Sequence, residues 1–194
     1  MTSDDSLRTF IAAPLASPVH DFLLHHQHLI AERPWAKRVR WIPQENVHLT
    51  LRFLGTTSPQ QVEILHRYLQ DTLTKLSAFD IDLLQPVPFP TIKRPRVVAA
   101  PVKRNRALEQ LVACIEAQVT RVRFAPEDRP YRGHVTIGRV KRSIPGKDLL
   151  TESPESIQTQ IKSVVFFKSE LTPTGAVYVK LHEYPLRAAA KVTA

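Results

Sequence analysis

The sequence is poor in cysteine and glycine, with one cysteine and five glycines in 194 residues. Because Cys114 has no second cysteine to pair with, an internal disulfide and a cysteine-only metal site are excluded. Residues 1–6 lack the basic and apolar stretches of a secretory signal peptide, and no apolar run approaches the length of a membrane span. We therefore expect a cytoplasmic protein that makes no membrane contact.

The short motifs of several enzyme classes are also absent. There is no G-x-S-x-G sequence, and Cys114 falls within a predicted helix, which disfavours a serine or cysteine hydrolase. There is no P-loop and no G-x-G-x-x-G dinucleotide-binding sequence. No pair of carboxylates accompanies the histidine motifs described below, which disfavours a two-metal site. We expect chemistry that uses neither a metal nor an organic cofactor.

Basic residues outnumber acidic ones, with 27 lysines and arginines against 18 aspartates and glutamates, a formal net charge of +9. An excess of this size favours a polyanionic partner, most simply nucleic acid. The alternative is an ordinary soluble surface that happens to be basic. Hydrophobic residues make up 43% of the chain, which argues against disorder and allows one domain with a real core.

Two short segments carry the same His-x-Thr motif in a strand-like context. Residues 46–55 read NVHLTLRFLG and residues 134–139 read HVTIGR. Both alternate β-branched or aromatic residues with polar ones, which predicts strands. Side chains two apart in a strand share a face, so His48 lies with Thr50 and His134 lies with Thr136.

The segment that leads into each motif is repeated as well. Residues 10–15 (FIAAPL) and 97–102 (VVAAPV) share the pattern apolar-apolar-Ala-Ala-Pro-apolar, and their prolines precede His48 and His134 by 34 and 33 positions. Each half is predicted to run strand, helix and His-x-Thr strand. We interpret this as an internal duplication, which favours a pseudo-symmetric domain with the two histidines on opposite sides of one cleft.

Paired histidines and threonines suit acid–base chemistry on a phosphate. The ordinary histidine pKa, about 6.5, allows one ring to give a proton and another to take one near neutral pH. Threonine hydroxyls on the same faces would donate to an oxyanion lying between the histidines. In-line attack at phosphorus needs the entering and leaving oxygens on opposite sides, which two pseudo-symmetric histidines supply.

The remaining chain is predicted from periodicity and capping signals. Helices are expected over 18–32, 59–76 and 106–122, strands over 7–14, 79–84, 96–102, 161–167 and 176–184, a proline-rich extended edge over 86–90, and a loop over 143–159. His25 and His28 share one helix face and could hold zinc, which leaves a zinc hydrolase as an alternative. His26, His66 and His182 are interpreted as structural.

Residues 46–55 and 129–139, taken together and in this order, resemble the two signatures of the two-histidine (2H) phosphoesterase superfamily. The resemblance is to the RNA 2',3'-cyclic phosphodiesterase (2'-5' RNA ligase) family and extends over nearly the whole chain. It implies a single α+β domain over 1–194, built of two pseudo-symmetric lobes with motifs at 48–51 and 134–137. Antiparallel sheets would line a central cleft, with helices outside.

The resemblance also implies an activity and a set of residue roles. The activity is metal-independent opening of a terminal 2',3'-cyclic phosphate of RNA to a 2'-phosphate, with reversible 2'-5' RNA ligation as a second expected activity. His48 would be the proton donor and His134 the proton acceptor. Thr50 and Thr136 would hold the non-bridging oxygens, and Arg139 matches an arginine that approaches the phosphate. The partners would be RNA ends or related nucleotides. The oligomeric state is left open by the sequence, and a monomer is the default expectation.

Two features depart from the expected pattern. Gly133 replaces the proline that usually precedes the second histidine. Strict alternation puts Arg139 on the face opposite His134 unless the strand bulges near Gly138, so Arg52, in phase with His48, is an alternative phosphate ligand. The alternative function is a binding module of the same fold that grips nucleotides or RNA ends without turnover.

Overall fold

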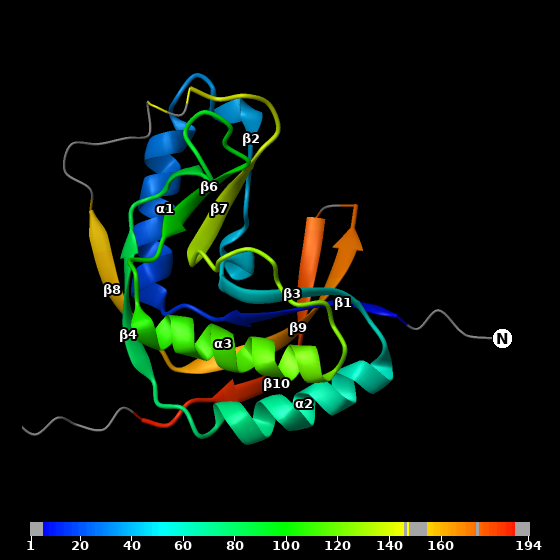
Figure 1. The fold of residues 1–194 in the computed structure, drawn as a ribbon. Helices are drawn as coiled ribbons and strands as arrows, with labels where there is room; N and C mark the ends of the chain where they lie inside the picture. The colour runs from blue at the N-terminus through cyan, green and yellow to red at the C-terminus, as the bar shows by residue number, and fades with distance from the viewer. Residues whose placement is uncertain (1–5, 146, 148–154, 174, 189–194) are drawn as a thin grey trace, which may run out of the picture.

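The computed structural model describes residues 6–145, 147, 155–173 and 175–188. Along the chain, the elements are β1 (Leu7–Ala13), α1 (Ser17–Ala31), η1 (Ala36–Arg38), β2 (Val39–Trp41), η2 (Gln44–Asn46), β3 (Leu49–Thr57), α2 (Pro59–Leu73), β4 (Phe79–Leu84), β5 (Val87–Phe89), β6 (Val97–Pro101), α3 (Arg106–Arg121), β7 (His134–Val140), β8 (Ser156–Ile161), β9 (Ser163–Thr172) and β10 (Gly175–Pro185). Figure 1 shows their arrangement.

Most of the strands form one antiparallel sheet. Its order is β10-β9-β1-β3-β7-β6-β5, with β2 paired to β7, and β4 and β8 form a separate two-stranded sheet. Helices α2 and α3 lie side by side, with α2 against β10 and α3 against β3, while α1 lies beside β8 (Figure 1). The predicted α+β fold with antiparallel sheets is confirmed. In the described part of the chain, no helix is long and apolar enough to cross a membrane.

The repeated Ala-Ala sequence occupies equivalent places in the two halves of the large sheet. In β1, Ala12 pairs with Thr50, and in β6, Ala99 pairs with Thr136. The next alanine of each repeat pairs with the residue between the motif histidine and threonine. These alanines are fully buried. Each motif strand therefore has small neighbours, which leave space beside the histidine and threonine side chains.

The two halves of the sheet join where β3 meets β7. The registered pair is Leu49 with Val135, in antiparallel orientation. Such a pair has a local twofold axis between its strands, and this axis relates the two His-x-Thr motifs. Both residues are fully buried in the core. The duplication in the sequence thus corresponds to a pseudo-twofold axis in the structure.

Capping residues explain where two helices begin. Ser58 and Gln61 form a capping box at the start of α2, with each side chain bonding the other residue's backbone N–H, and Pro59 takes the first helical position. The Asn105 side chain accepts from the Leu108 backbone N–H at the start of α3. Both starts agree with the prediction, whereas α2 ends at Leu73, three residues before the predicted end.

The prediction of a loop over 143–159 is wrong at its C-terminal end. Strand β8 begins at Ser156 and pairs along its whole length with β4, and Ile161, predicted to open the next strand, ends β8. The segment reads SIQTQI, whose polar residues suggested a loop. Only Thr159 and Ile161 are buried in it, because the strand covers the core with one face. Residues 146 and 148–154 of the predicted loop lie outside the described residues.

Gly138 gives a test of the packing beside β7. A Cβ atom at this position would lie 2.5 Å from Cγ1 of Val39 and 3.0 Å from the Trp41 ring. Gly138→Ala should therefore force β2 outward and cost about 1–3 kcal/mol of unfolding free energy. Urea denaturation measures this, with exposed Thr56→Ala, expected to cost less than about 1 kcal/mol, as the control. Equal stability of the two variants would contradict the packing argument.

Candidate active site

The join between β3 and β7 gathers the four motif side chains on one face of the sheet. Because Leu49 and Val135 point into the core, the residues on either side of them point to the opposite face. Continuing the antiparallel register by one residue in each direction brings His48 beside Thr136 and Thr50 beside His134. The two predicted motifs are thus brought together, related by the pseudo-twofold axis.

Both histidines are held by the same backbone contact. Nδ1 of His48 lies 2.8 Å from the carbonyl oxygen of Asn46, and Nδ1 of His134 lies 2.7 Å from that of Arg132. A carbonyl oxygen can only accept, so Nδ1 is the donor in each ring. In the neutral imidazole, Nε2 then has a free lone pair. Each half of the site therefore presents an Nε2 atom that can take or give a proton.

His48 is packed among aromatic rings. Phe10 stacks on it at 4.9 Å between ring centroids, and Tyr178 meets it edge-on at 5.3 Å. This burial lowers the pKa of His48 to about 4, against a weaker raising effect of the Asn46 carbonyl. The positive charge of Arg139 lowers the pKa further. His48 is consequently neutral at pH 7 while the site holds no anion.

His134 has a simpler environment. The Phe89 ring stacks on it at 4.2 Å, and the guanidinium of Arg132 lies over Phe89 at 4.6 Å. Burial lowers the pKa of His134, while its bond to the Arg132 carbonyl raises it and the Arg132 charge lowers it. Both rings are thus desolvated, and their protonated forms are disfavoured until a negative charge lies beside them.

A β-bulge follows the motif in each half of the sheet. In β3, Ala12 pairs with Thr50 but Ile11 pairs with Arg52, so Leu51 is an extra residue. The same shift in β7 leaves an extra residue after Thr136, because Ala99 pairs with Thr136 and Val98 with the residue two further on. An extra residue reverses the alternation of side chains beyond it. The fifth residue after each motif histidine therefore returns to the histidine's face.

This reversal brings Arg139 to the site and takes Arg52 away from it. Arg139 is exposed, forms no ion pair with the described part of the chain, and lies close enough to affect the pKa of His48. The bulge required near Gly138 is present. Strict alternation misplaced Arg139 because it assumes an unbroken period of two.

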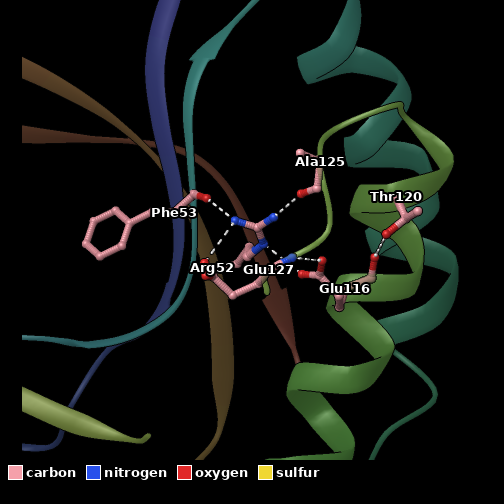
Figure 2. Close-up of polar contacts among 6 residues, drawn as sticks. All are labelled: Arg52, Phe53, Glu116, Thr120, Ala125 and Glu127. Atoms are coloured by element: carbon pink, nitrogen blue, oxygen red, sulfur yellow. Dashed lines mark hydrogen bonds and ion pairs between the residues drawn. The ribbon is translucent and has the colours of Figure 1, made fainter. Parts of the chain in front are cut away.

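The prediction that Arg52 shares the face of His48 is wrong. Nε of Arg52 donates to Glu116 at 2.7 Å, and its Nη atoms donate to the carbonyls of Phe53 and Ala125, each at 2.6 Å. Glu127 lies within ion-pair distance, at 3.6 Å. Figure 2 shows the guanidinium turned toward α3, while the Phe53 ring points to the other side of the strand. Arg52 ties β3 to α3 and to the segment that follows it.

The remaining histidines lie in other surroundings. His66 stacks on His182 at 3.6 Å and its Nδ1 lies 3.2 Å from the Tyr184 hydroxyl, while His26 is buried against Phe22. The helix face that suggested zinc contributes to no cluster: among the described residues, no three His, Cys, Asp or Glu side chains are grouped as metal ligands. The zinc alternative has no geometric support there.

A cavity of about 690 Å³ lies next to the paired motifs; none of the four motif side chains lines it, but Phe10 and Tyr178 line it and also contact the His48 ring. Aromatic rings and arginines line much of it: Phe10, Trp41, Phe53, Tyr178, Arg8 and Arg139. Sequence analysis missed its aromatic character. Phe10 was found only as part of the repeat, and Tyr178 comes from a strand 130 positions after His48, with no local motif to indicate its role. The cavity size is within the range of small-molecule and nucleotide pockets.

Two His-x-Thr strands joined across a pseudo-twofold axis define a two-histidine phosphoesterase. The chain belongs to the 2'-5' RNA ligase superfamily, whose family model matches residues 24–173. The family predicted from the sequence is thereby confirmed.

Known proteins similar to this chain agree with the assignment. The RNA 2',3'-cyclic phosphodiesterase of Methanothermobacter thermautotrophicus is 27% identical over 93% of this chain and 99% of its own length. That of Thermotoga maritima is 27% identical over 91% and 94%. The crystal structure of TT0787 of Thermus thermophilus superposes with a TM-score of 0.80 at 25% identity, covering 94% of this chain and 99% of that one. E. coli LigT complexed with 3'-AMP shares the fold, with a TM-score of 0.76 at 21% identity and coverage of 93% and 98%.

The lowered pKa of His48 predicts that the unfolding free energy decreases as the pH falls. Its folded-state value, about 4, lies below the ordinary 6.5, so the unfolded chain binds more protons between these values and unfolding becomes easier as the pH falls through that window. At about 1.4 kcal/mol per pKa unit, the loss from pH 7 to pH 4 is up to roughly 3 kcal/mol. Replacing the ring by an uncharged side chain, His48→Gln, should remove this part of the pH dependence.

Denaturation at pH 7, 5.5 and 4 gives the slope of the unfolding free energy against pH for the wild type and for His48→Gln. The slope should be smaller for His48→Gln. His28→Gln, at an exposed position on α1, is the matched control and should keep the wild-type slope. If His48→Gln and wild type lost stability in parallel, the desolvation of His48 would be contradicted.

Proposed function

We propose that this protein is an RNA 2',3'-cyclic phosphodiesterase that opens a terminal cyclic phosphate and leaves a 2'-phosphate, with no metal in the reaction. The observation that carries the proposal is the pair of histidines held identically at Nδ1 across the pseudo-twofold axis, each with Nε2 left for chemistry. Family membership supports it, and so do the full-length relatives that are RNA 2',3'-cyclic phosphodiesterases.

In the proposed reaction, the cyclic phosphate lies between the two Nε2 atoms. His134 takes a proton from water, and the water oxygen attacks phosphorus opposite the 3'-oxygen. The bond from phosphorus to the 3'-oxygen breaks, and His48 gives that oxygen a proton. The product carries a 2'-phosphate and a free 3'-hydroxyl. The proton gained by His134 and the proton lost by His48 are then exchanged with solvent.

The position of the cavity supports this assignment of donor and acceptor. In a 2',3'-cyclic phosphate, the leaving 3'-oxygen belongs to the ribose, so water must approach from the side away from the nucleoside. The cavity lies on the His48 side, where Phe10 and Tyr178 contact the ring and also line the cavity. A nucleoside in this cavity puts its 3'-oxygen next to His48 and leaves the opposite side to His134.

A proton donor needs a proton, and the pKa of His48 is about 4 in the free site. A phosphate anion between the histidines would raise this pKa, since an opposite charge close by favours the protonated ring. The same anion would offset the charge of Arg139, which lowers the pKa in the free protein. Substrate binding would therefore recruit the proton that the reaction consumes.

Thr50, Thr136 and Arg139 complete the proposed phosphate site. The threonine hydroxyls on the histidines' face would donate to the two non-bridging oxygens, and Arg139 would balance their charge. If a 5'-hydroxyl of another RNA took the place of water, the same steps would join the chains by a 2'-5' linkage. Ligation would thus require no further catalytic group.

Turnover of an RNA ending in a 2',3'-cyclic phosphate, assayed with a chelator present, tests the proposal. His48→Ala and His134→Ala should each lower the rate by at least roughly 10²-fold, because each removes a group that carries a proton in the transition state. His25→Ala and His66→Ala, outside the site, should stay within about twofold of wild type.

Identifying which hydroxyl keeps the phosphate completes the assay. A 3'-phosphate product would contradict the orientation of the nucleoside. Binding of the RNA without any turnover would leave the non-catalytic binding module as the function. Activity that is lost on chelation and restored by zinc would overturn the metal-free mechanism.

The threonines test the geometry separately from the acid–base roles. Thr50→Val and Thr136→Val keep the β-branched shape but delete the hydroxyl donor. Each should lower kcat by about 10–10³-fold, the range from a lost neutral hydrogen bond to a lost oxyanion donor. The pH–rate profile should stay bell-shaped, because both histidines still titrate. Full activity together with a large loss of stability would identify the threonines as packing residues instead.

A further inference from the structure

Phe53 is the counterpart of Arg139 in the other half of the sheet. Each is the fifth residue after its motif histidine, and each follows the equivalent bulge. The pseudo-twofold axis therefore puts a phenyl ring where the second half has a guanidinium. Phe53 is 59% exposed, a large fraction for a phenylalanine next to a packed aromatic cluster. No step of the proposed reaction uses it.

The Phe53 ring neighbours Phe10, which in turn stacks on the His48 ring. Phe10 contacts both, at 4.9 Å from His48 and 5.9 Å from Phe53 between ring centroids. Phe10 itself is only 3% exposed, whereas Phe53 presents its ring to the cavity. A nucleoside placed against His48 by its cyclic phosphate would lie near Phe10 and Tyr178, and Phe53 would remain for a group beyond it.

Arg8 adds a positive charge to the same part of the cavity. It lies two residues before Phe10 on β1, so both side chains are on one face of the strand, and it is exposed opposite Thr56. The cavity wall around Phe53 thus combines an open aromatic ring with an arginine. This combination is typical of sites that bind single-stranded nucleic acid, where bases stack on aromatic side chains and cations contact the backbone.

We propose that the cavity binds the nucleotide preceding the one that carries the cyclic phosphate, with its base stacked on Phe53 and its phosphodiester near Arg8. The inference rests on the proposed function and makes it more specific: the substrate is an RNA chain of two or more nucleotides in preference to a free cyclic mononucleotide. Stacking accepts any base, because every base has a π-face. The site would thus discriminate between substrates by the length of the RNA chain and not by its base sequence.

The test compares kcat/KM for a 2',3'-cyclic mononucleotide with kcat/KM for a short RNA ending in the same cyclic nucleotide. In the wild type, the short RNA should be the better substrate. Phe53→Ala should lower the ratio of the two values by about 5- to 100-fold, the effect of one lost stacking contact. Phe53→Trp should restore most of the ratio, whereas Phe53→Leu, apolar but without a π-face, should not.

The matched control is Val179→Ala, which trims an exposed apolar residue of β10 that does not line the cavity. This control should keep the wild-type ratio. Arg8→Gln should also lower the ratio, and it should reduce the salt dependence of RNA affinity by about 0.7 in the slope of log affinity against log salt, as for one lost phosphate contact. An unchanged ratio in Phe53→Ala, or equal losses on both substrates, would overturn the proposal.

A binding measurement separates this inference from the catalytic one. The His134→Ala variant, with and without Phe53→Ala, is titrated with a short RNA ending in a 2'-phosphate and with the 2'-phosphate mononucleotide. The Phe53 substitution should weaken binding of the short RNA by the same 5- to 100-fold and have a smaller effect on the mononucleotide. This result would stand even if the wild type hydrolysed neither cyclic substrate. Equal weakening of both ligands would overturn the chain-length role.

Discussion

The active-site geometry depends on the pairing of Leu49 with Val135, where the two halves of the sheet meet. This pair points its side chains into the core, and the backbone alternation on either side sends two histidines and two threonines to the other face. A slip of one residue in this register would bury those polar groups and expose the core residues. Packing of two aliphatic side chains thus fixes the separation of the two motif histidines.

The bulge that follows each motif gives a symmetric framework an asymmetric site. Because the bulges are equivalent, the fourth residue after each histidine is turned toward the protein interior and the fifth toward the cavity. In one half these residues are Arg52 and Phe53, and in the other Gly138 and Arg139. Arg52 finds carboxylates on α3, while Gly138 leaves room for β2 to approach. The same backbone device thus places a charge on one side of the axis and an aromatic ring on the other.

Much of this arrangement could be predicted from the sequence because it depends on local patterns. The His-x-Thr pairs, the repeated Ala-Ala-Pro and the caps at Ser58 and Asn105 are all short-range signals, and the structure agrees with each. The bulges could not be predicted in the same way. Neither Leu51 nor its counterpart differs in type from a regular strand residue, so the side on which each arginine lies depends on pairing with a distant strand.

The aromatic rings around His48 (Phe10 and Tyr178) and strand β8 could not be predicted for the same reason. Tyr178 reaches His48 only through sheet order, because β9 separates β10 from β1. The polar residues of β8 look like a loop until β4 is seen to pair with them. Sequence patterns therefore identify the paired motif residues, while long-range pairing decides which other residues surround them.

The surroundings of the histidines determine when the site becomes reactive. Rings packed against His48 and His134 remove water and disfavour the imidazolium, so the empty site holds two neutral bases. If His48 is the proton donor, as proposed, the site would gain its acid only when an anion binds beside both His48 and Arg139. In the proposed reaction, desolvation would act as a selection step, because a ligand without a negative charge between the rings would leave His48 without the proton that the leaving oxygen needs. Aromatic packing, which looks like ordinary structural support, would in this way couple recognition of the phosphate to the formation of the acid.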